Sequence, residues 1–169
     1  VRTVENYADI LVIRHSVEGA AKIAAEYATV PVINAGDGSH QHPTQTLLDL
    51  YTIKKEMGKI KGVKVALCGD LKYGRTVHSL AYGLSLFGAE VTCVAPPQLA
   101  FPKYLQKDLE GEFGTKIYEK NNLSEALDAD VLYMTRIQKE RFADQTEYER
   151  VKHSCVLTKE LADKFKGIV

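Results

Sequence analysis

The segment from Asn34 to Tyr51, NAGDGSHQHPTQTLLDLY, places two histidines and a proline directly before an apolar helical pattern. The histidines are His40 and His42, and Pro43 takes the first position of the expected helix, where proline is favoured. A helix start exposes unpaired backbone N–H groups and a partial positive charge, so it favours an anion or a polarised oxygen. The sequence therefore predicts a polar ligand site at the beginning of this helix.

Arginine side chains are expected close behind several strands. Arg14, Arg75 and Arg136 follow three predicted strands, although the chain has only six arginines. Ligands of open parallel sheets bind beyond the carboxyl ends of the strands, and the guanidinium fork matches carboxylate and phosphate groups. Each arginine taken alone could equally pair with a nearby carboxylate of the protein. Their coincidence with the helix start predicts a cleft for a small, multiply anionic set of ligands.

Two other segments resemble a dinucleotide-binding motif and a zinc site, but neither has the residue spacing that such a site needs. The segment GDLKYGR, residues 69–75, follows a predicted strand and precedes a predicted helix, yet it is not the G-x-G-x-x-G fingerprint of a dinucleotide site. The segment HQH, residues 40–42, has no cysteine or acidic residue at a usual zinc-ligand spacing. We expect neither a metal nor a cofactor, and a nucleotide-binding Rossmann protein is the weakest alternative.

These side chains must be positioned by elements that alternate between short β-branched runs and longer helical patterns. Strands are expected at residues 8–13, 30–35, 63–69, 90–95, 115–118 and 130–134, and residues 167–169 resemble the opening of a seventh. Helices are expected at residues 16–28, 43–57, 74–87, 101–111, 123–128 and 158–165. Such alternation is typical of right-handed βαβ units and a mostly parallel sheet.

The expected strands are continuous apolar runs, which indicates that both faces of the sheet are covered. Ser16 is the expected N-cap of the first helix, and Gly58 is expected to end the second. The polar segment KKEMGKIKG, residues 54–62, is the best internal boundary. The predicted fold is therefore α/β, with two lobes of parallel sheets flanked by helices, at residues 1–57 and 58–169.

Composition excludes several classes of protein. Lys+Arg and Asp+Glu both total 22, so no global charge favours nucleic acid or an anionic membrane. No apolar stretch approaches the ~20 residues of a membrane span. Cys68, Cys93 and Cys155 are odd in number and widely spaced, which indicates buried thiols in a reducing, cytoplasmic compartment. The sequence starts without methionine and ends in what resembles a strand, so we expect a fragment truncated at both ends.

Taken together, four ordered motifs carry a family resemblance. They are VIRH (12–15), NAGDGSHQHPTQTLLDL (34–50), GDLKYGRTVHSL (69–80) and VLYMTRIQKERF (131–142). In this order they closely resemble the middle of the catalytic chains of aspartate carbamoyltransferases, within the transcarbamoylase family. The resemblance implies a transcarbamoylase-like fold with a Rossmann-like second lobe. It also implies that residues 1–57 end the carbamoyl phosphate-binding domain and that residues 58–169 form most of the aspartate-binding domain.

The resemblance implies a reaction in which carbamoyl phosphate and L-aspartate give N-carbamoyl-L-aspartate and phosphate, the committed step toward pyrimidines. By motif correspondence, Arg14 and His42 would donate hydrogen bonds to the carbonyl oxygen of carbamoyl phosphate and stabilise the developing oxyanion. Gln45 would accept a hydrogen bond from the carbamoyl NH₂ group. On the same basis, the two carboxylates of aspartate would be held by a set of three side chains: Arg75, Arg136 and Gln138.

The resemblance also implies a homotrimer with sites at subunit boundaries, and in some members a regulatory chain that carries zinc. The family's S-T-R-T and H-P-L-P segments, and the loop that lends a serine and a lysine to the neighbouring subunit, are absent from these 169 residues. We therefore expect little or no turnover from this polypeptide alone. Two alternatives remain. One is a transcarbamoylase with another acceptor such as ornithine, whose positive charge Arg75 and Arg136 would disfavour. The other is a non-catalytic α/β assembly module.

Overall fold

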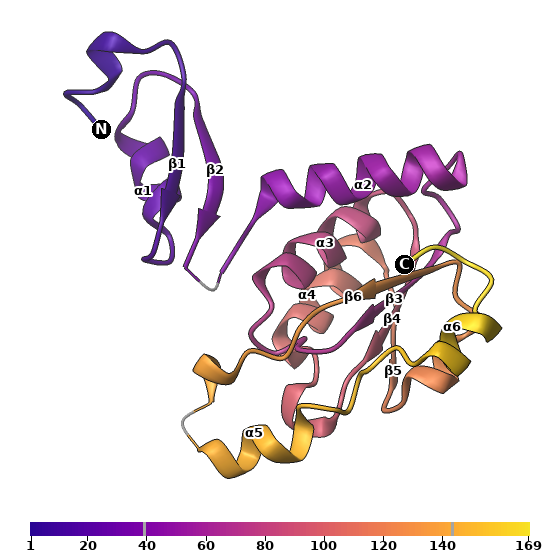
Figure 1. Cartoon of the computed structure of the whole chain (residues 1–169). Helices are drawn as coiled ribbons and strands as arrows, with labels where there is room; N and C mark the ends of the chain where they lie inside the picture. Colours follow the sequence, from indigo (N-terminus) through magenta and orange to yellow (C-terminus); the bar gives the residue numbers. More distant parts are fainter. Residues whose placement is uncertain (39, 143) are drawn as a thin grey trace.

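The computed structural model describes residues 1–38, 40–142 and 144–169, which form two lobes of unequal size (Figure 1). The strands are β1 (Leu11–His15), β2 (Val32–Asp37), β3 (Lys64–Cys68), β4 (Glu90–Val94), β5 (Ile117–Lys120) and β6 (Val131–Met134). The α-helices are α1 (Ala20–Tyr27), α2 (Pro43–Met57), α3 (Arg75–Leu86), α4 (Lys103–Phe113), α5 (Gln145–Val151) and α6 (Lys159–Lys164). Short 3-10 turns are η1 (Glu5–Tyr7), η2 (Pro97–Leu99), η3 (Leu123–Ala126) and η4 (Lys139–Arg141).

Both sheets are parallel, as the alternation of strands and helices predicts. In the first lobe β1 pairs with β2, and α1 provides the connection between them. In the second lobe the strand order is β5-β4-β3-β6, and the reversal of order places β3 between β4 and β6. Ile168 extends this sheet by an isolated parallel bridge to Val131. The predicted α/β fold with two lobes of parallel sheets is thus confirmed.

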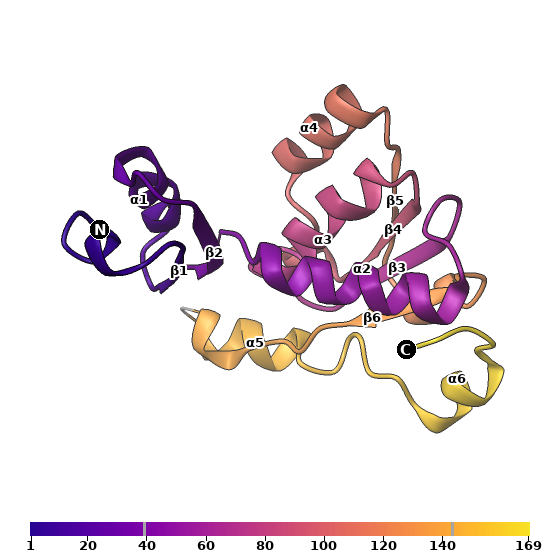
Figure 2. The ribbon, with the colours of Figure 1, turned by 90° about the horizontal axis from the view of Figure 1, so that it is seen from above.

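Alternate residues of the larger sheet build separate cores on its two faces. Val65 and Leu67 of β3 belong to the larger core, whereas Ala66 and Cys68 belong to the smaller one. All four are 1% exposed or less. The strand is therefore covered on both faces, as its continuous apolar run predicts. Figure 2 shows α2, α3 and α4 on one side of β6, with α5 and α6 on the other.

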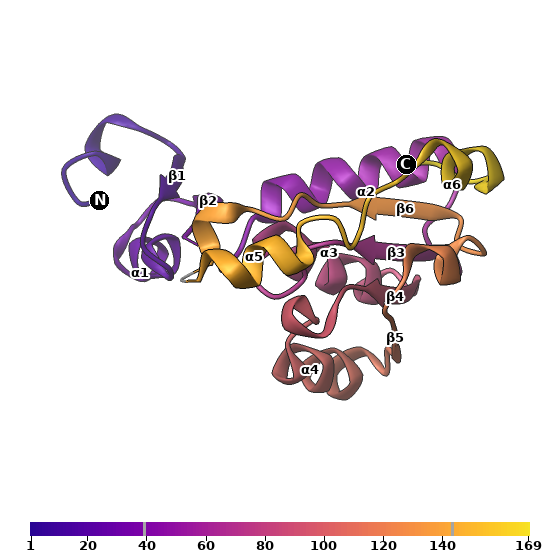
Figure 3. The ribbon, with the colours of Figure 1, turned by 60° about the horizontal axis from the view of Figure 1, so that its bottom comes forward.

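The helix α2 joins the two lobes. It begins beside β2 and runs along α3, and its Leu50 and Ile53 are buried in the larger core of the second lobe. Figure 3 shows α2, α3 and α4 in succession across the sheet. Pro43 is the first residue of α2, and Gly58 ends the helix in the left-handed conformation at φ 74°, as predicted. A side chain at the start of α2 is therefore held by contacts with both lobes.

Gly83 allows α2 and α3 to approach closely. A β-carbon at this position would lie 2.7 Å from Thr46 Cγ2 and 2.9 Å from Leu50 Cδ1, on the facing side of α2. Thr46 and Leu50 are 7% and 6% exposed, so neither can move into solvent. Gly111 in α4 is also helical, but a β-carbon added there would have no atom within 4 Å.

We expect the substitutions Gly83→Ala and Gly111→Ala to change stability in opposite directions. Alanine favours a helix over glycine by about 0.5–1 kcal/mol, and Gly111→Ala should show this gain. In Gly83→Ala the crowding against α2 costs about 1–3 kcal/mol and outweighs the gain. Urea denaturation of the two variants measures the difference in the free energy of unfolding. An equal stabilisation by both substitutions would contradict the close packing of α2 on α3.

Three local expectations differ from the structure. Ser16 is not the N-cap of the first helix, because α1 begins only at Ala20, after Gly19. The Gly19 N–H instead donates to Asp37 Oδ2 at 2.8 Å, which ties this segment to the end of β2 and delays the helix. The segment 123–128 is a 3-10 turn at Leu123–Ala126, not an α-helix. The short helix α5 was not predicted; Asp144 caps it by accepting from Thr146 N at 2.8 Å.

Candidate active site

Five of the six predicted site residues line one cavity of about 310 Å³. It lies beyond the carboxyl ends of β2, β3 and β6, where parallel sheets place their ligands. The predicted residues that line it are His42, Gln45, Arg75, Arg136 and Gln138. The other lining residues are Asp70, Gly74, Thr76, Tyr133, Met134 and Thr135. The two lobes thus contribute side chains to a single concave site.

The buried carboxylate of Asp37 organises the loop between β2 and α2. Its Oδ1 accepts from Asn34 Nδ2 and from Gln41 N, both at 3.1 Å, and its Oδ2 accepts from Gly19 N at 2.8 Å. His40 Nδ1 lies 3.5 Å from Oδ2. Burial alone would raise the pKa of Asp37, but these hydrogen bonds outweigh it and hold the pKa below its ordinary value. The loop is consequently fixed from within.

We expect Asp37→Asn to lower the free energy of unfolding by about 1–3 kcal/mol at neutral pH, because an amide cannot accept at both positions. A carboxylate with a depressed pKa stabilises the fold above its unfolded pKa, and this stabilisation is lost as the pH falls through the folded pKa. The difference between variant and wild type should therefore shrink in acid. Urea denaturation at several pH values measures it, with the exposed Asp9→Asn as the control. Equal stability of Asp37→Asn and wild type at neutral pH would contradict this role.

His42 stands at the N-cap of α2, with its backbone anchored to the second lobe. Its N–H donates to Ser79 Oγ at 2.8 Å, and Ser79 Oγ donates to Gln41 Oε1 at 2.6 Å. The pKa of His42 is lowered, first by burial and then by the positive charges of Arg75 and Arg14. A neutral imidazole at physiological pH follows from this environment.

The His42 ring has a hydroxyl neighbour at Nδ1, which can donate to this nitrogen or accept from it. Thr44 Oγ1 lies 3.3 Å from His42 Nδ1, so the hydroxyl can donate to that nitrogen. In that tautomer Nε2 holds the proton and is the hydrogen-bond donor of the ring. An oriented N–H donor of this kind can polarise a carbonyl oxygen.

Arg75, the first residue of α3, reaches across to the loop of the first lobe. Its Nη1 donates to the Gly38 carbonyl oxygen at 2.7 Å. Gly36 has φ 115°, and a β-carbon there would lie 3.5 Å from both Arg75 Cζ and His42 Cδ2. The glycine-rich loop therefore allows the guanidinium and the imidazole to flank the same short stretch of backbone.

Arg136 and Gln138 follow β6 and are positioned by the contact between the ends of β3 and β6. Thr135 Oγ1 donates to the Cys68 carbonyl oxygen at 2.9 Å and accepts from Asp70 N at 3.0 Å. Gly69 has φ 112°, and a β-carbon there would lie 2.3 Å from the Thr135 carbonyl oxygen. The two loops therefore leave the sheet in direct contact.

Arg14 occupies a different position from the other predicted residues. It lies on β1, its side chain is exposed, and among the described residues it is not part of the cavity lining. It is nevertheless close enough to His42 for its charge to lower the pKa of the imidazole. The structure thus places Arg14 beside the cavity, on the side of His42.

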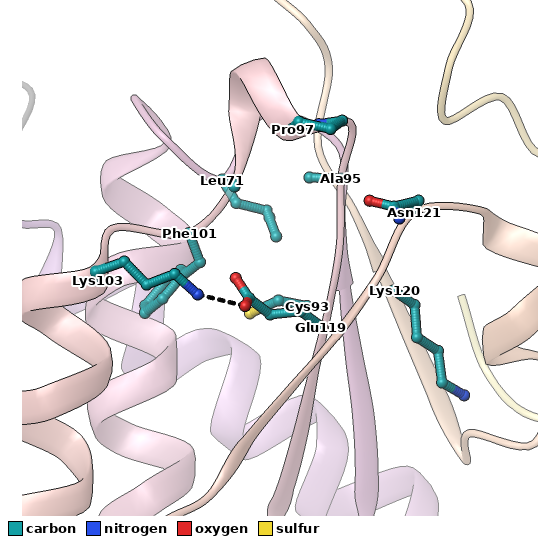
Figure 4. A pocket seen from close by; sticks show the side chains of 10 residues that line it. Leu71, Cys93, Ala95, Pro97, Phe101, Lys103, Glu119, Lys120 and Asn121 are labelled. Atoms are coloured by element: carbon teal, nitrogen blue, oxygen red, sulfur yellow. Dashed lines mark hydrogen bonds and ion pairs between the residues drawn. The ribbon is translucent and has the colours of Figure 1, made fainter.

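A second cavity of about 350 Å³ lies at the carboxyl ends of β4 and β5 (Figure 4). Leu71 and Phe101 contribute apolar walls, and Lys103 forms an ion pair with Glu119 at its edge. The ammonium of Lys120 is directed away and contacts Asp128 at 3.3 Å. Because the lysine charges here are neutralised by carboxylates, this cavity suits a dianionic ligand less well than the first.

Among the described residues, no group of three or more His, Cys, Asp or Glu side chains could hold a metal ion. Within the same ranges, no helix has both the length and the apolar character needed to cross a bilayer.

Comparison with known proteins agrees with the two-lobe geometry. The carbamoyl phosphate-binding domain of aspartate/ornithine carbamoyltransferases matches residues 1–55, and their Asp/Orn-binding domain matches residues 61–168. The chain belongs to the aspartate/ornithine carbamoyltransferase family. The second match alone covers more than half of the chain.

Similar members of this carbamoyltransferase family include archaeal proteins. The aspartate carbamoyltransferase catalytic subunit of Methanopyrus kandleri is 57% identical over 165 residues, covering 97% of this chain and 53% of that protein. The solved catalytic subunit of Methanocaldococcus jannaschii aspartate transcarbamoylase has 56% identity and a TM-score of 0.87, covering 99% of this chain and 56% of that one. The chain spans about half the length of the curated relatives it matches.

A more distant carbamoyltransferase is informative because of its ligand. The Trypanosoma cruzi aspartate transcarbamoylase has been solved in complex with N-(phosphonacetyl)-L-aspartic acid. It is 38% identical to this chain with a TM-score of 0.88, and the match covers 99% of this chain and 55% of that one.

Some residues of the cavity lining were not predicted as site residues. Asp70, which is 2% exposed, lines the cavity and accepts from Tyr73 N at 3.0 Å. Its position directly after β3 is the same signal that identified the arginines. Tyr133 lines the cavity from within β6, and no local pattern distinguishes it from the other apolar residues of that strand.

Proposed function

We propose that the full-length protein is an aspartate carbamoyltransferase, which transfers the carbamoyl group of carbamoyl phosphate to the amine of L-aspartate. The products are N-carbamoyl-L-aspartate and phosphate, in pyrimidine biosynthesis. The observation that carries this proposal is the single cavity lined by His42 and Gln45 of α2 and by Arg75, Arg136 and Gln138 of the second lobe. The names of the similar catalytic subunits support the same reaction.

The carbamoyl half of the reaction depends on an electrophilic carbonyl carbon. His42 donates a hydrogen bond to the carbonyl oxygen, and Arg14 adds positive charge from beside the cavity. Both contributions strengthen as the carbonyl becomes an oxyanion, and one such donor is typically worth about 3–4 kcal/mol of barrier. Because the donor is a neutral imidazole, it works without titrating in the physiological range. Gln45 accepts from the carbamoyl NH₂ group and sets the direction of the carbonyl plane.

The aspartate half of the reaction depends on positioning. Arg75, Arg136 and Gln138 hold the two carboxylates and direct the amine at the carbonyl carbon. Correct orientation of two bound reactants can contribute up to about 7–11 kcal/mol. The amine lone pair forms the new C–N bond, the C–O bond to the phosphate breaks, and the amine proton leaves with the phosphate group. No redox step and no covalent enzyme intermediate are needed.

The division of the chain into two domains supports the assignment of carbamoyl phosphate to the first lobe and aspartate to the second. Residues 1–57 form the C-terminal part of the carbamoyl phosphate-binding domain, and residues 58–169 form most of the aspartate-binding domain. The two family matches fall on either side of this boundary, at residues 1–55 and 61–168. The helix α2 ends at Met57 and carries the carbamoyl-side residues onto the second lobe. The 169 residues alone hold only part of the site and have little or no turnover.

The full-length protein is a cytoplasmic homotrimer with active sites at its subunit boundaries, as the family resemblance implies. A regulatory chain as a further partner is consistent with the words "catalytic subunit" in the names of the relatives. Sedimentation analysis of the full-length protein tests this assembly, and a monomer at assay concentration would contradict it.

An initial-rate assay of the full-length protein with carbamoyl phosphate and either aspartate or ornithine tests the proposed reaction. We expect carbamoyl-aspartate to form and ornithine to be a poor acceptor, because two guanidinium groups disfavour a cationic side chain. Faster turnover of ornithine would reassign the acceptor. Turnover of neither amine would favour a non-catalytic assembly module.

A further inference from the structure

A carboxylate that is not part of the described cavity lining lies directly behind Gln45. Asp49 is one helical turn further along α2, and its Oδ1 accepts from Gln45 Nε2 at 2.9 Å. Its Oδ2 accepts from the hydroxyl of Tyr133 at 3.0 Å, across the boundary between α2 and β6. Both carboxylate oxygens are therefore engaged by side chains that themselves line the cavity.

The chemistry of Asp49 determines which end of the Gln45 amide faces the cavity. An ionised carboxylate only accepts hydrogen bonds, whereas a glutamine amide has a donor end and an acceptor end of nearly the same shape. The NH₂ end must therefore face Asp49, and the carbonyl oxygen Oε1 is left for the cavity. Tyr133 also donates to Asp49. Burial is the main reason that the pKa of Tyr133 is raised to about 12, so its hydroxyl keeps its proton and remains a hydrogen-bond donor.

We propose that Asp49 is a positioning residue that makes the site select a donor with an NH₂ group on the reacting carbon over one with a methyl group. The inference rests on the proposed function, because it assigns the selectivity of the same site. A carbamoyl group offers an N–H to Gln45 Oε1, whereas an acetyl group of the same size offers only C–H. A site that presents a fixed acceptor rejects the ligand that leaves this acceptor unpaired.

Burial disfavours the charged form of Asp49, so its ionisation does not itself stabilise the fold. Burial raises the pKa of Asp49 above its ordinary value, although Gln45 and Tyr133 donate to it. A raised pKa means that the ionised form is destabilised in the fold relative to the unfolded chain. A charge kept in such a place is better explained by the orientation of Gln45 than by stability.

Calorimetric titration of the full-length protein with carbamoyl phosphate and with acetyl phosphate, at mildly alkaline pH, tests the inference. In Asp49→Leu the Gln45 amide has no fixed partner, so we expect the affinity for carbamoyl phosphate to fall about tenfold. The affinity for acetyl phosphate should change by less than about twofold, since it never used the acceptor. The exposed Thr52→Val on the same helix is the matched control and should alter neither affinity.

Asp49→Asn provides a second, nearly isosteric variant in case the leucine disturbs the fold. An asparagine can satisfy Gln45 in either amide orientation, so only about half of the molecules present the acceptor and the preference for carbamoyl phosphate falls about twofold. Equal weakening of both ligands, or an unchanged preference in both variants, would overturn the inference. If the inference fails in this way, the proposed function still holds as long as the wild-type protein transfers the carbamoyl group of carbamoyl phosphate to aspartate. Wild-type protein without transfer would overturn the proposed function itself.

Discussion

Replacement of His42 by alanine is expected to lower kcat of the full-length protein by about 10²–10³-fold, with a small change in the KM for aspartate. The imidazole lies at the edge of the cavity, and its pKa is lowered by burial and by the charges of Arg75 and Arg14. In the proposed function it acts as a neutral donor, and such a hydrogen bond is strongest when the carbonyl oxygen carries negative charge. Initial rates over a range of both substrates separate kcat from KM.

Two further variants make the His42 prediction specific. His42→Gln restores an N–H donor of similar reach, so it should recover part of the lost kcat. His153→Ala removes an exposed histidine outside the cavity lining and should leave kcat within about twofold of wild type. Unchanged turnover in His42→Ala would contradict the role of the imidazole in carbonyl polarisation.

Replacement of Arg136 by alanine is expected to raise the KM for aspartate by about 100-fold or more, and to leave the KM for carbamoyl phosphate nearly unchanged. A guanidinium paired with a carboxylate in a partly enclosed site is typically worth about 2–5 kcal/mol on truncation. Arg136 lines the cavity from the segment that follows β6, whereas His42 belongs to the loop that precedes α2. Its loss should therefore affect one substrate only. Steady-state kinetics with each substrate varied in turn measures the two KM values.

Two further variants make the Arg136 prediction specific: Arg136→Lys at the same position, and Arg150→Ala as a control elsewhere on the surface. Lysine keeps the charge but not the planar fork, so Arg136→Lys should restore only part of the affinity for aspartate. Arg150 is exposed on α5, and its replacement should leave both KM values unchanged. A similar rise of both KM values in Arg136→Ala would indicate a general distortion and contradict the assignment to aspartate.

The features predicted correctly from the sequence are those that local chemistry determines. Pro43 and Gly58 bound α2 as expected, because each residue suits one backbone conformation at a helix end. The apolar runs of β3 and β4 indicated a covered parallel sheet, since both faces of these strands must be buried. Arg75 and Arg136 stand behind strands as expected, and both line one cavity at the ends of those strands.

The features that escaped prediction depend on contacts between distant segments. Ser16 has the chemistry of an N-cap, but the bond from Gly19 N to Asp37 moves the helix start to Ala20. Asp37 looks like an ordinary loop residue until the ends of β1 and β2 are brought side by side. The bond between Tyr133 and Asp49 spans 84 positions, so no local pattern could indicate it. Arg14 follows the same strand-end rule as the other arginines, yet its side chain lies beside the cavity.

Calorimetric titration of the full-length protein with N-(phosphonacetyl)-L-aspartate tests most directly whether groups from both lobes face one shared cavity. This ligand joins mimics of the two substrates, so it should bind once per chain. Its affinity should fall at least about tenfold in both His42→Ala and Arg136→Ala. The affinity for carbamoyl phosphate alone should fall only in His42→Ala. Binding of the joined ligand that is insensitive to either substitution would contradict the shared site.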